Sequence, residues 1–138
     1  MPDDPKAVVT DSAAAASAWA TGEKTYNGAI SVDVDGNPLA ALGRQAKAAG
    51  KATGLVTTAQ VTDASPAAFL ANTANRSAQD EIARQYIEVS KPDVILGGGE
   101  DWWLPAGSPG ASRTSPPRTA PRWRTTGAPP ATPVWTFP

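Results

Sequence analysis

Asp11 and Ser12 are the residues of this 138-residue chain whose types and position most directly suggest chemistry. They follow a short apolar run at 7–9 and precede four consecutive alanines at 13–16. A serine in the first helical turn after a buried strand lies at the carboxyl edge of a sheet, where open α/β folds bind ligands. The unpaired N–H groups and the helix dipole there favour an anion such as phosphate. The same pair is also typical of an ordinary helix N-cap, so residue types alone leave both interpretations open.

The residues that the chain lacks restrict the chemistry of such a site. There is no histidine, which is the usual general base near neutral pH and a common zinc ligand. There is no cysteine, which excludes disulfides, thiolate catalysis and zinc–cysteine sites. The 12 basic and 13 acidic side chains leave a net charge of −1, so nothing favours nucleic acid or an anionic membrane as a partner. The N-terminus shows no signal-peptide pattern, and no apolar run approaches the roughly 20 residues that span a bilayer.

The elements that would position Asp11 and Ser12 alternate between strands and helices. Short apolar runs predict buried strands at 7–10, 54–58 and 93–97. Helices are predicted from Ser12 onward and over 38–50, 65–72 and 77–90. Pro38 is expected to begin the second helix and Ser77 to cap the last one, while 22–37 should form an exposed hairpin or long loop. The pattern predicts an α/β fold with a parallel sheet covered on both faces.

The composition changes after residue 106. From 111 to 138 there are seven prolines and four arginines, but no lysine, acidic residue, leucine or isoleucine. We therefore expect an α/β domain over 1–106 and an unstructured Pro/Arg/Thr-rich tail over 107–138. Loss of the reading frame near Gly110 is the explanation that we favour, because shifted GC-rich codons produce this composition. A native disordered linker is the alternative.

Several motifs, all in one collinear order, resemble the alkaline phosphatase family. The segments VTDSAAAAS, WATG and KTYNGAI are similar to the family's nucleophile region. The likeness continues through AAGKATGLVTTAQVTDASPAAF and DVILGGG to about residue 106. The resemblance implies part of a three-layer αβα parallel-sheet fold. It also implies a metal-dependent phosphate monoester hydrolase that works through a phosphoserine intermediate.

The resemblance also implies roles for individual residues. Ser12 corresponds to the nucleophile, which attacks phosphorus and lies at the metal site. Asp11 corresponds to the carboxylate that holds the substrate-binding arginine, and Arg76 corresponds to that arginine, whose planar guanidinium suits phosphate oxygens. Asp63 and Ser65 fall where the family places residues around its magnesium. Ser65 stands for a usual threonine and keeps the oxygen ligand.

Zinc and magnesium are the cofactors that the resemblance implies, but most of the family's metal ligands have no counterpart here. The metal-binding aspartate upstream of Val8 is missing, as are the zinc-binding aspartates and histidines beyond the Gly97–Gly99 run. We therefore expect an internal fragment with little activity of its own. Ser17 also replaces a usual threonine, and we expect this change to matter less because Ser17 lies a turn into the helix.

The resemblance further suggests a periplasmic or secreted enzyme that forms homodimers. A different class of function stays open beside the hydrolase. In this alternative the chain is a non-catalytic phosphate- or partner-binding α/β module, which uses the same helix N-terminus without chemistry. The absence of histidine favours the binding module for this polypeptide, whereas the series of motifs favours the enzyme.

Overall fold

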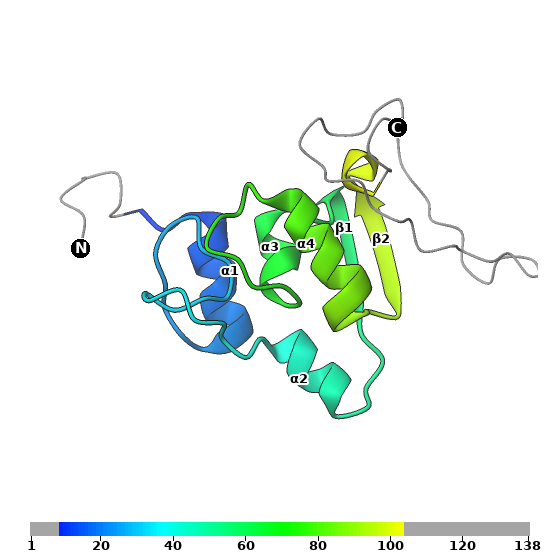
Figure 1. Cartoon of the computed structure of the whole chain (residues 1–138), viewed down its shortest axis with the longest axis horizontal. Coiled ribbons are helices and arrows are strands. Elements are labelled where there is room, and N and C mark those ends of the chain that lie inside the picture. The colour runs from blue at the N-terminus through cyan, green and yellow to red at the C-terminus, as the bar shows by residue number, and fades with distance from the viewer. Residues whose placement is uncertain (1–8, 104–138) are drawn as a thin grey trace, which may run out of the picture.

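The structure is a computed structural model that describes residues 9–103 (Figure 1). Its main elements follow one another as α1 Ser12–Thr21, α2 Leu42–Ala48, β1 Gly54–Gln60, α3 Ala64–Ala68, α4 Gln79–Gln85 and β2 Val94–Gly98. A π-helix, η2 (Tyr86–Ser90), continues α4, and a 3-10 turn, η3 (Glu100–Trp102), follows β2. The predicted domain boundary at 106 and the tail at 107–138 lie outside the described residues.

The strands β1 and β2 pair in parallel, as the alternation of strands and helices predicts. Gly54 lies opposite Val94, and the pairing shifts near the end so that Gln60 lies opposite Gly98. The helices α3, α4 and η2 form the crossover between the two strands, which is the connection that a parallel pair requires. The chain therefore has an α/β fold with a parallel sheet.

The predicted first strand at 7–10 is not found among the described residues. Ala7 and Val8 lie outside them, and Val9 and Thr10 have irregular backbone. The side chain of Asn27 donates a hydrogen bond to the Val9 carbonyl at 2.8 Å, where a strand neighbour was expected. In the described part of the chain the sheet has two strands.

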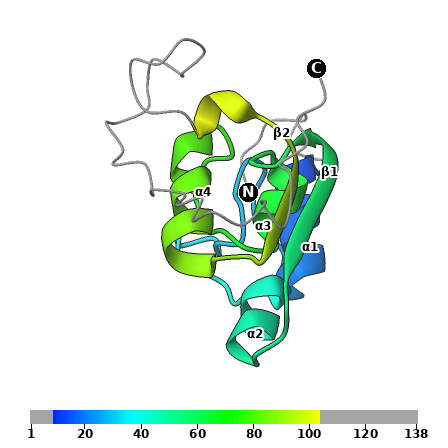
Figure 2. The same ribbon diagram turned by 90° about the vertical axis from the view of Figure 1, so that its right-hand side faces the viewer.

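Only one face of this sheet is covered by helices within residues 9–103. In Figure 1, α1 and α3 lie to the left of the two strands, and in Figure 2, which looks from the side of the strands, α4 lies to their left. Leu55 is buried against the helical side, whereas its neighbour Val56 is 76% exposed. The predictions that β1 is buried and that both faces are covered are therefore wrong for the described residues.

The second helix begins later than predicted. Pro38 forms an isolated antiparallel bridge with Val32, and the N–H of Leu39 donates to the carbonyl of Ser31 at 2.8 Å. These contacts hold the backbone around Pro38 in an extended conformation, so α2 begins at Leu42.

The two later helices also differ from the prediction. The expected helix at 65–72 is shortened to α3, and the expected helix at 77–90 is divided into α4 and the π-helix η2. Ser77 does not cap α4, because the N-cap is Ala78 and makes no side-chain hydrogen bond. The N–H of Ser77 instead donates to Oδ1 of Asn75 at 2.9 Å, within a turn that precedes the helix.

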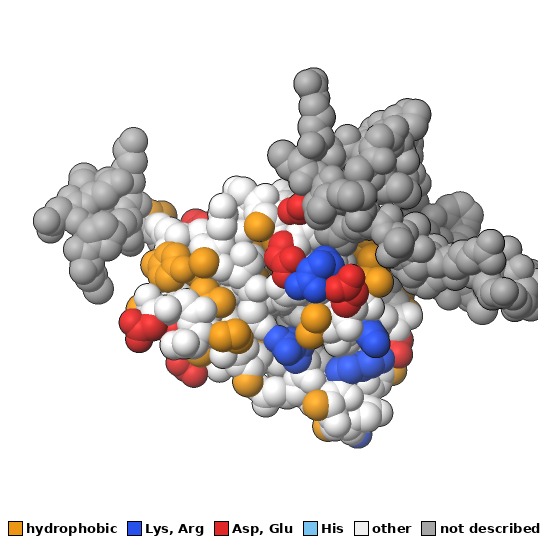
Figure 3. Space-filling view, viewed as in Figure 1, with side chains coloured by type: hydrophobic (Ala, Val, Ile, Leu, Met, Phe, Trp, Pro, Cys, Tyr) orange, Lys and Arg blue, Asp and Glu red, His pale blue; other side chains and the backbone are white. Residues whose placement is uncertain are grey.

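The helix α1 packs closely against α3 through small side chains. Its alanines at 13, 14, 16 and 20 are buried, which lets the two helices approach each other. Larger side chains complete the core, namely Ile30, Leu70, Ile82 and Tyr86. Trp19, on the outer side of α1, is 72% exposed. Figure 3 shows hydrophobic side chains on the surface at the end of the molecule that holds α1 and the loop after it.

In the part of the chain that the structure describes, no helix has the length and apolar composition needed to cross a bilayer.

Candidate functional site

Asp11 connects the start of α1 with two other parts of the chain. Its Oδ1 accepts the N–H of Ala14 at 2.9 Å and so caps the helix. Its Oδ2 accepts the N–H of Gly28 at 3.1 Å and lies 3.3 Å from Nη1 of Arg76. The N-cap interpretation of Asp11 is therefore correct, and the same carboxylate also binds the arginine.

Arg76 bridges the N-termini of α1 and α3. Its Nη1 donates to Asp11 and also to Oγ of Ser12, at 3.2 Å. Its Nη2 donates to Oδ1 of Asp63 at 2.8 Å. Two carboxylates thus fix the guanidinium from both sides, and it touches the hydroxyl of Ser12.

Arg76 keeps donors that these contacts do not use. A guanidinium has five N–H donors, and the three bonds to Asp11, Ser12 and Asp63 use three of them. The other two have no partner within residues 9–103. The side chain is 31% exposed, so solvent or a ligand can reach it. The unused donors are the Nε–H and one N–H of Nη2, which can bind oxygens of a phosphate or carboxylate.

Ser12 is the first residue of α1 and is exposed. Its hydroxyl therefore lies at the positive end of the helix dipole, within hydrogen-bond distance of a cation. Asp63 has the same position in α3 that Asp11 has in α1. Its Oδ1 accepts the N–H of Ala64 at 2.7 Å, which makes it the N-cap.

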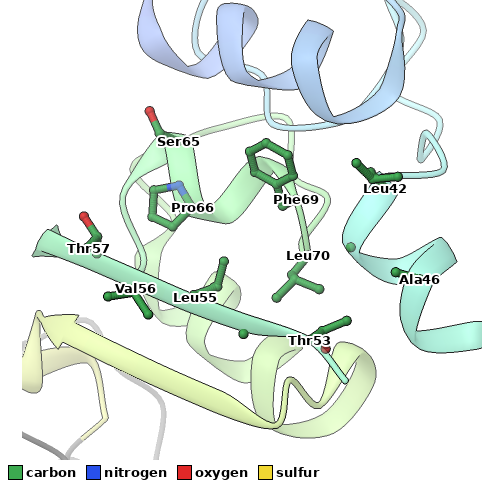
Figure 4. Close-up of a pocket in the computed structure, with 12 residues that line it drawn as sticks. Leu42, Ala46, Thr53, Leu55, Val56, Thr57, Ser65, Pro66, Phe69 and Leu70 are labelled. Carbon is green, nitrogen blue, oxygen red and sulfur yellow. The ribbon is translucent and has the colours of Figure 1, made fainter. Parts of the chain in front are cut away.

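Ser65 is not part of this set of hydrogen bonds. It is exposed on the first turn of α3 and lines an open groove of about 490 Å³ between α2, β1 and α3. The groove is mostly apolar, with Leu42, Phe69 and Leu70 on its walls, and Figure 4 shows Ser65 beside Pro66 and Thr57 at one end. The structure thus brings together Ser12, Asp11, Asp63 and Arg76, and within residues 9–103 Ser65 makes no side-chain hydrogen bond to them.

The described residues do not form a complete metal site. Between residues 9 and 103, no group of three or more His, Cys, Asp or Glu side chains could hold a metal ion. Asp63 already shares one oxygen with Arg76 and Ala64. Magnesium takes about six oxygen ligands, so Asp63 and Ser65 alone do not fit it.

Asn27 and Gly28 belong to the site, although their types predicted only a turn. The side chain of Asn27 binds the backbone on both sides of Thr10, and Gly28 binds both Asp11 and Arg76. An Asn-Gly pair indicates a turn with positive φ, and Gly28 has φ +87°. No local pattern indicates that this turn reaches the start of α1, because that contact depends on the tertiary fold.

Comparison with known proteins places this geometry in a family. The family model described as alkaline phosphatase matches residues 1–121. Alkaline phosphatase 4 of Bacillus subtilis is 46% identical over 107 residues, which cover 74% of this chain and 23% of that protein. The chain thus spans about a quarter of the length of such relatives.

Solved structures agree with the sequence comparison. A cold-active alkaline phosphatase from a psychrophilic Shewanella is 50% identical, with a TM-score of 0.66 over 70% of this chain and 24% of that one. A variant of the alkaline phosphatase from the Antarctic bacterium TAB5, described with Mg bound in its M3 site, is 38% identical. Its TM-score is 0.67 over 72% of this chain and 29% of that one. The matched residues include the whole candidate site, and the chain belongs to the alkaline phosphatase family.

Proposed function

We propose that the protein is a phosphate monoester hydrolase, with Ser12 as the nucleophile and Arg76 as the residue that binds phosphate. The contact between Arg76 and the hydroxyl of Ser12 is the observation that supports this most. A phosphate can bind the unused N–H groups of Arg76, and Nη1 of the same guanidinium contacts that hydroxyl near the positive end of α1.

The proposed reaction has two displacements at phosphorus. Oγ of Ser12 attacks, the bond between phosphorus and the ester oxygen breaks, and the alcohol leaves with the hydroxyl proton. Water then attacks the phosphoserine, which releases inorganic phosphate and restores the Ser12 hydroxyl. Arg76 holds two phosphate oxygens in both steps, while Asp11 and Asp63 orient its guanidinium.

We propose zinc and magnesium as cofactors of the whole protein, and not of the 138-residue chain alone. Asp63 and Ser65 offer two oxygen atoms near the start of α3, and a magnesium ion there needs further ligands. We expect titration of Mg²⁺ into the 138-residue chain, followed by calorimetry, to give no binding heat at millimolar concentration. Binding there would mean that this chain holds a complete site.

A phosphate-binding module without turnover is the second candidate for this polypeptide. The absence of histidine and of a three-ligand metal cluster in residues 9–103 favours it, since Arg76 can bind an anion without either. The two candidates share the phosphate site and differ in whether Ser12 reacts.

Two further properties are proposed for the whole protein from the family resemblance. We propose that it is exported to the periplasm or the medium and that it assembles as a homodimer. Cell fractionation and light scattering of the complete protein test these proposals.

A chimera tests the hydrolase proposal. Residues 1–106 replace the matching segment of the Bacillus relative, and hydrolysis of p-nitrophenyl phosphate is measured with zinc and magnesium at alkaline pH. We expect the chimera to be active. Ser12→Ala should prevent it from forming the phosphoserine. Arg76→Ala should weaken phosphate binding and slow the reaction, yet still allow a phosphoserine. Ser77→Ala, an exposed serine outside the site, is the matched control and should keep the activity.

Other outcomes contradict the proposal in different ways. A chimera that stays active with Ser12→Ala means that another group is the nucleophile. A folded chimera without activity means that this segment does not support hydrolysis. For the isolated 138-residue chain we expect little or no turnover, and metal-dependent turnover that Ser12→Ala abolishes would show that the chain alone is sufficient.

A further inference from the structure

The turn at Asn27 is bound to the start of α1 by its side chain. Oδ1 of Asn27 accepts the N–H of Asp11 at 3.0 Å, and its Nδ2 donates to the carbonyl of Val9 at 2.8 Å. One amide therefore binds the backbone before and after Thr10, immediately ahead of Ser12. Asn27 is exposed, so these two bonds and not packing are its contribution to the structure.

Gly28 is bound to both charged partners of the site. Its N–H donates to Oδ2 of Asp11 at 3.1 Å, and its carbonyl accepts the backbone N–H of Arg76 at 2.8 Å. The same oxygen of Asp11 binds the Arg76 guanidinium. The backbone of one residue thus sets the separation between the carboxylate and the arginine.

The segment after Gly28 strengthens this connection. Ile30 and Thr73 form an isolated antiparallel bridge with bonds of 2.8 and 2.9 Å, and Ile30 is fully buried. The loop that carries Arg76 is therefore fixed to the loop that carries Gly28, three residues away from the arginine.

We propose that Asn27 and Gly28 are positioning residues that fix where Ser12 and Asp11 lie relative to Arg76. This inference rests on the proposed function, in which phosphate binds between Arg76 and Ser12. Binding the Asp11 N–H and the Val9 carbonyl together needs one acceptor and one donor at a fixed spacing. The side-chain amide of Asn27 supplies both. A carboxylate at this position can still accept from Asp11, but it cannot donate to Val9 and adds a negative charge near the phosphate.

The task at position 28 needs a positive φ. Gly28 has φ +87°, and a Cβ added there meets nothing within 4 Å. A substitution at this position therefore tests the backbone conformation without a steric clash. Asn adopts positive φ more readily than Ala does, so Gly28→Asn should be better tolerated than Gly28→Ala.

The first experiment needs no ligand. Nitrogen–proton NMR spectra of the 138-residue chain report the Ser12 amide and the Nε–H of Arg76. We expect Asn27→Ala and Asn27→Asp to shift both signals. Asn37→Ala should leave them unchanged, because Asn37 is an exposed turn asparagine whose hydrogen bonds within residues 9–103 are to Asp33. Unchanged Ser12 and Arg76 signals in both Asn27 variants would overturn the proposal.

The second experiment measures binding of inorganic phosphate to the same variants. We expect Asn27→Ala to lower the affinity by roughly tenfold, with an unfolding midpoint no lower than that of Asn37→Ala. Gly28→Ala should lose more affinity than Gly28→Asn. Wild-type affinity in Asn27→Ala would contradict the positioning role. A wild-type chain that binds no phosphate would contradict the proposed function, and the NMR result would then decide the positioning role by itself.

Discussion

Ser17 is fully buried in α1 and joins this helix to the loop at 29–31. Its hydroxyl accepts the N–H of Ser31 at 2.7 Å and lies within hydrogen-bond distance of the carbonyls of Ala13 and Ala29, at 2.8 and 3.2 Å. We expected the replacement of threonine here to matter little. Serine keeps the hydroxyl that threonine would supply, so the replacement can retain these bonds and the expectation stays a prediction.

Ser17→Ala should therefore destabilise the chain. The substitution leaves the buried N–H of Ser31 without its acceptor, which costs about 1–3 kcal/mol. Urea unfolding of the 138-residue chain measures this loss. Ser77→Ala, which removes an exposed hydroxyl, should change the free energy of unfolding by less than about 0.5 kcal/mol. Equal stabilities of the two variants would mean that the Ser17 hydroxyl does not hold the loop.

At the scale of elements, one carboxylate ties α2 to the beginning of the sheet. Oδ1 of Asp93 accepts from Nζ of Lys47 at 2.7 Å, and Oδ2 accepts the N–H of Thr53 at 2.8 Å. The hydrogen bond from Lys47, followed by that from Thr53, lowers the pKa of Asp93 below its ordinary value of 3.8.

This lowered pKa predicts the sign of a pH effect. The folded chain binds the proton less tightly than the unfolded chain, so the contribution of Asp93 is fully present above pH 3.8. It is lost as the pH falls through the lower pKa of the folded state. We expect acid to destabilise the wild-type chain more steeply than Asp93→Asn, as measured by urea unfolding between pH 6 and pH 3. Asp33, whose pKa is also lowered, is present in both proteins and cancels in the comparison.

Local sequence patterns predicted which segments form helices and strands better than they predicted the residues at which these begin and end. The β-branched runs placed β1 and β2 correctly, and the residue types of Asp11 and Asp63 suited them to cap helices. Pro38 and Ser77 were wrong as helix starts. The residues on either side of Pro38 hydrogen-bond to Ser31 and Asp33, and the N–H of Ser77 donates to the side chain of Asn75; no helix rule includes these contacts.

The candidate site could be predicted only in part, because its contacts join residues that lie far apart in the sequence. Asp11 and Asp63 could be proposed from the family resemblance. Both carboxylates bind Arg76, which is 13 positions from Asp63 and 65 positions from Asp11. Only the fold brings these residues together. The role of Asn27 needed the same information, since its local signal indicated a turn and no more.

At the scale of the molecule, the sheet has one buried and one open face within residues 9–103. Leu55 is 8% exposed and Val56 is 76% exposed. Leu55→Ala should cost about 2–4 kcal/mol, because it leaves a cavity under the helices. Val56→Ala should stay within about 0.5 kcal/mol in this chain. Chemical denaturation of both variants tests the difference, and a large cost for Val56→Ala would show that this face is covered in solution.

The parallel pairing of β1 with β2 also has a consequence for how the chain is made. Gly54 pairs with Val94, so Gly54 is synthesised 40 residues before its partner. At a translation rate of roughly 5–20 residues per second, Gly54 is made about 2–8 s before Val94. During that interval the edges of β1 and the apolar side chains beside it are open to other nascent chains. A chaperone that binds extended apolar segments could therefore bind β1 before β2 emerges and pairs with it.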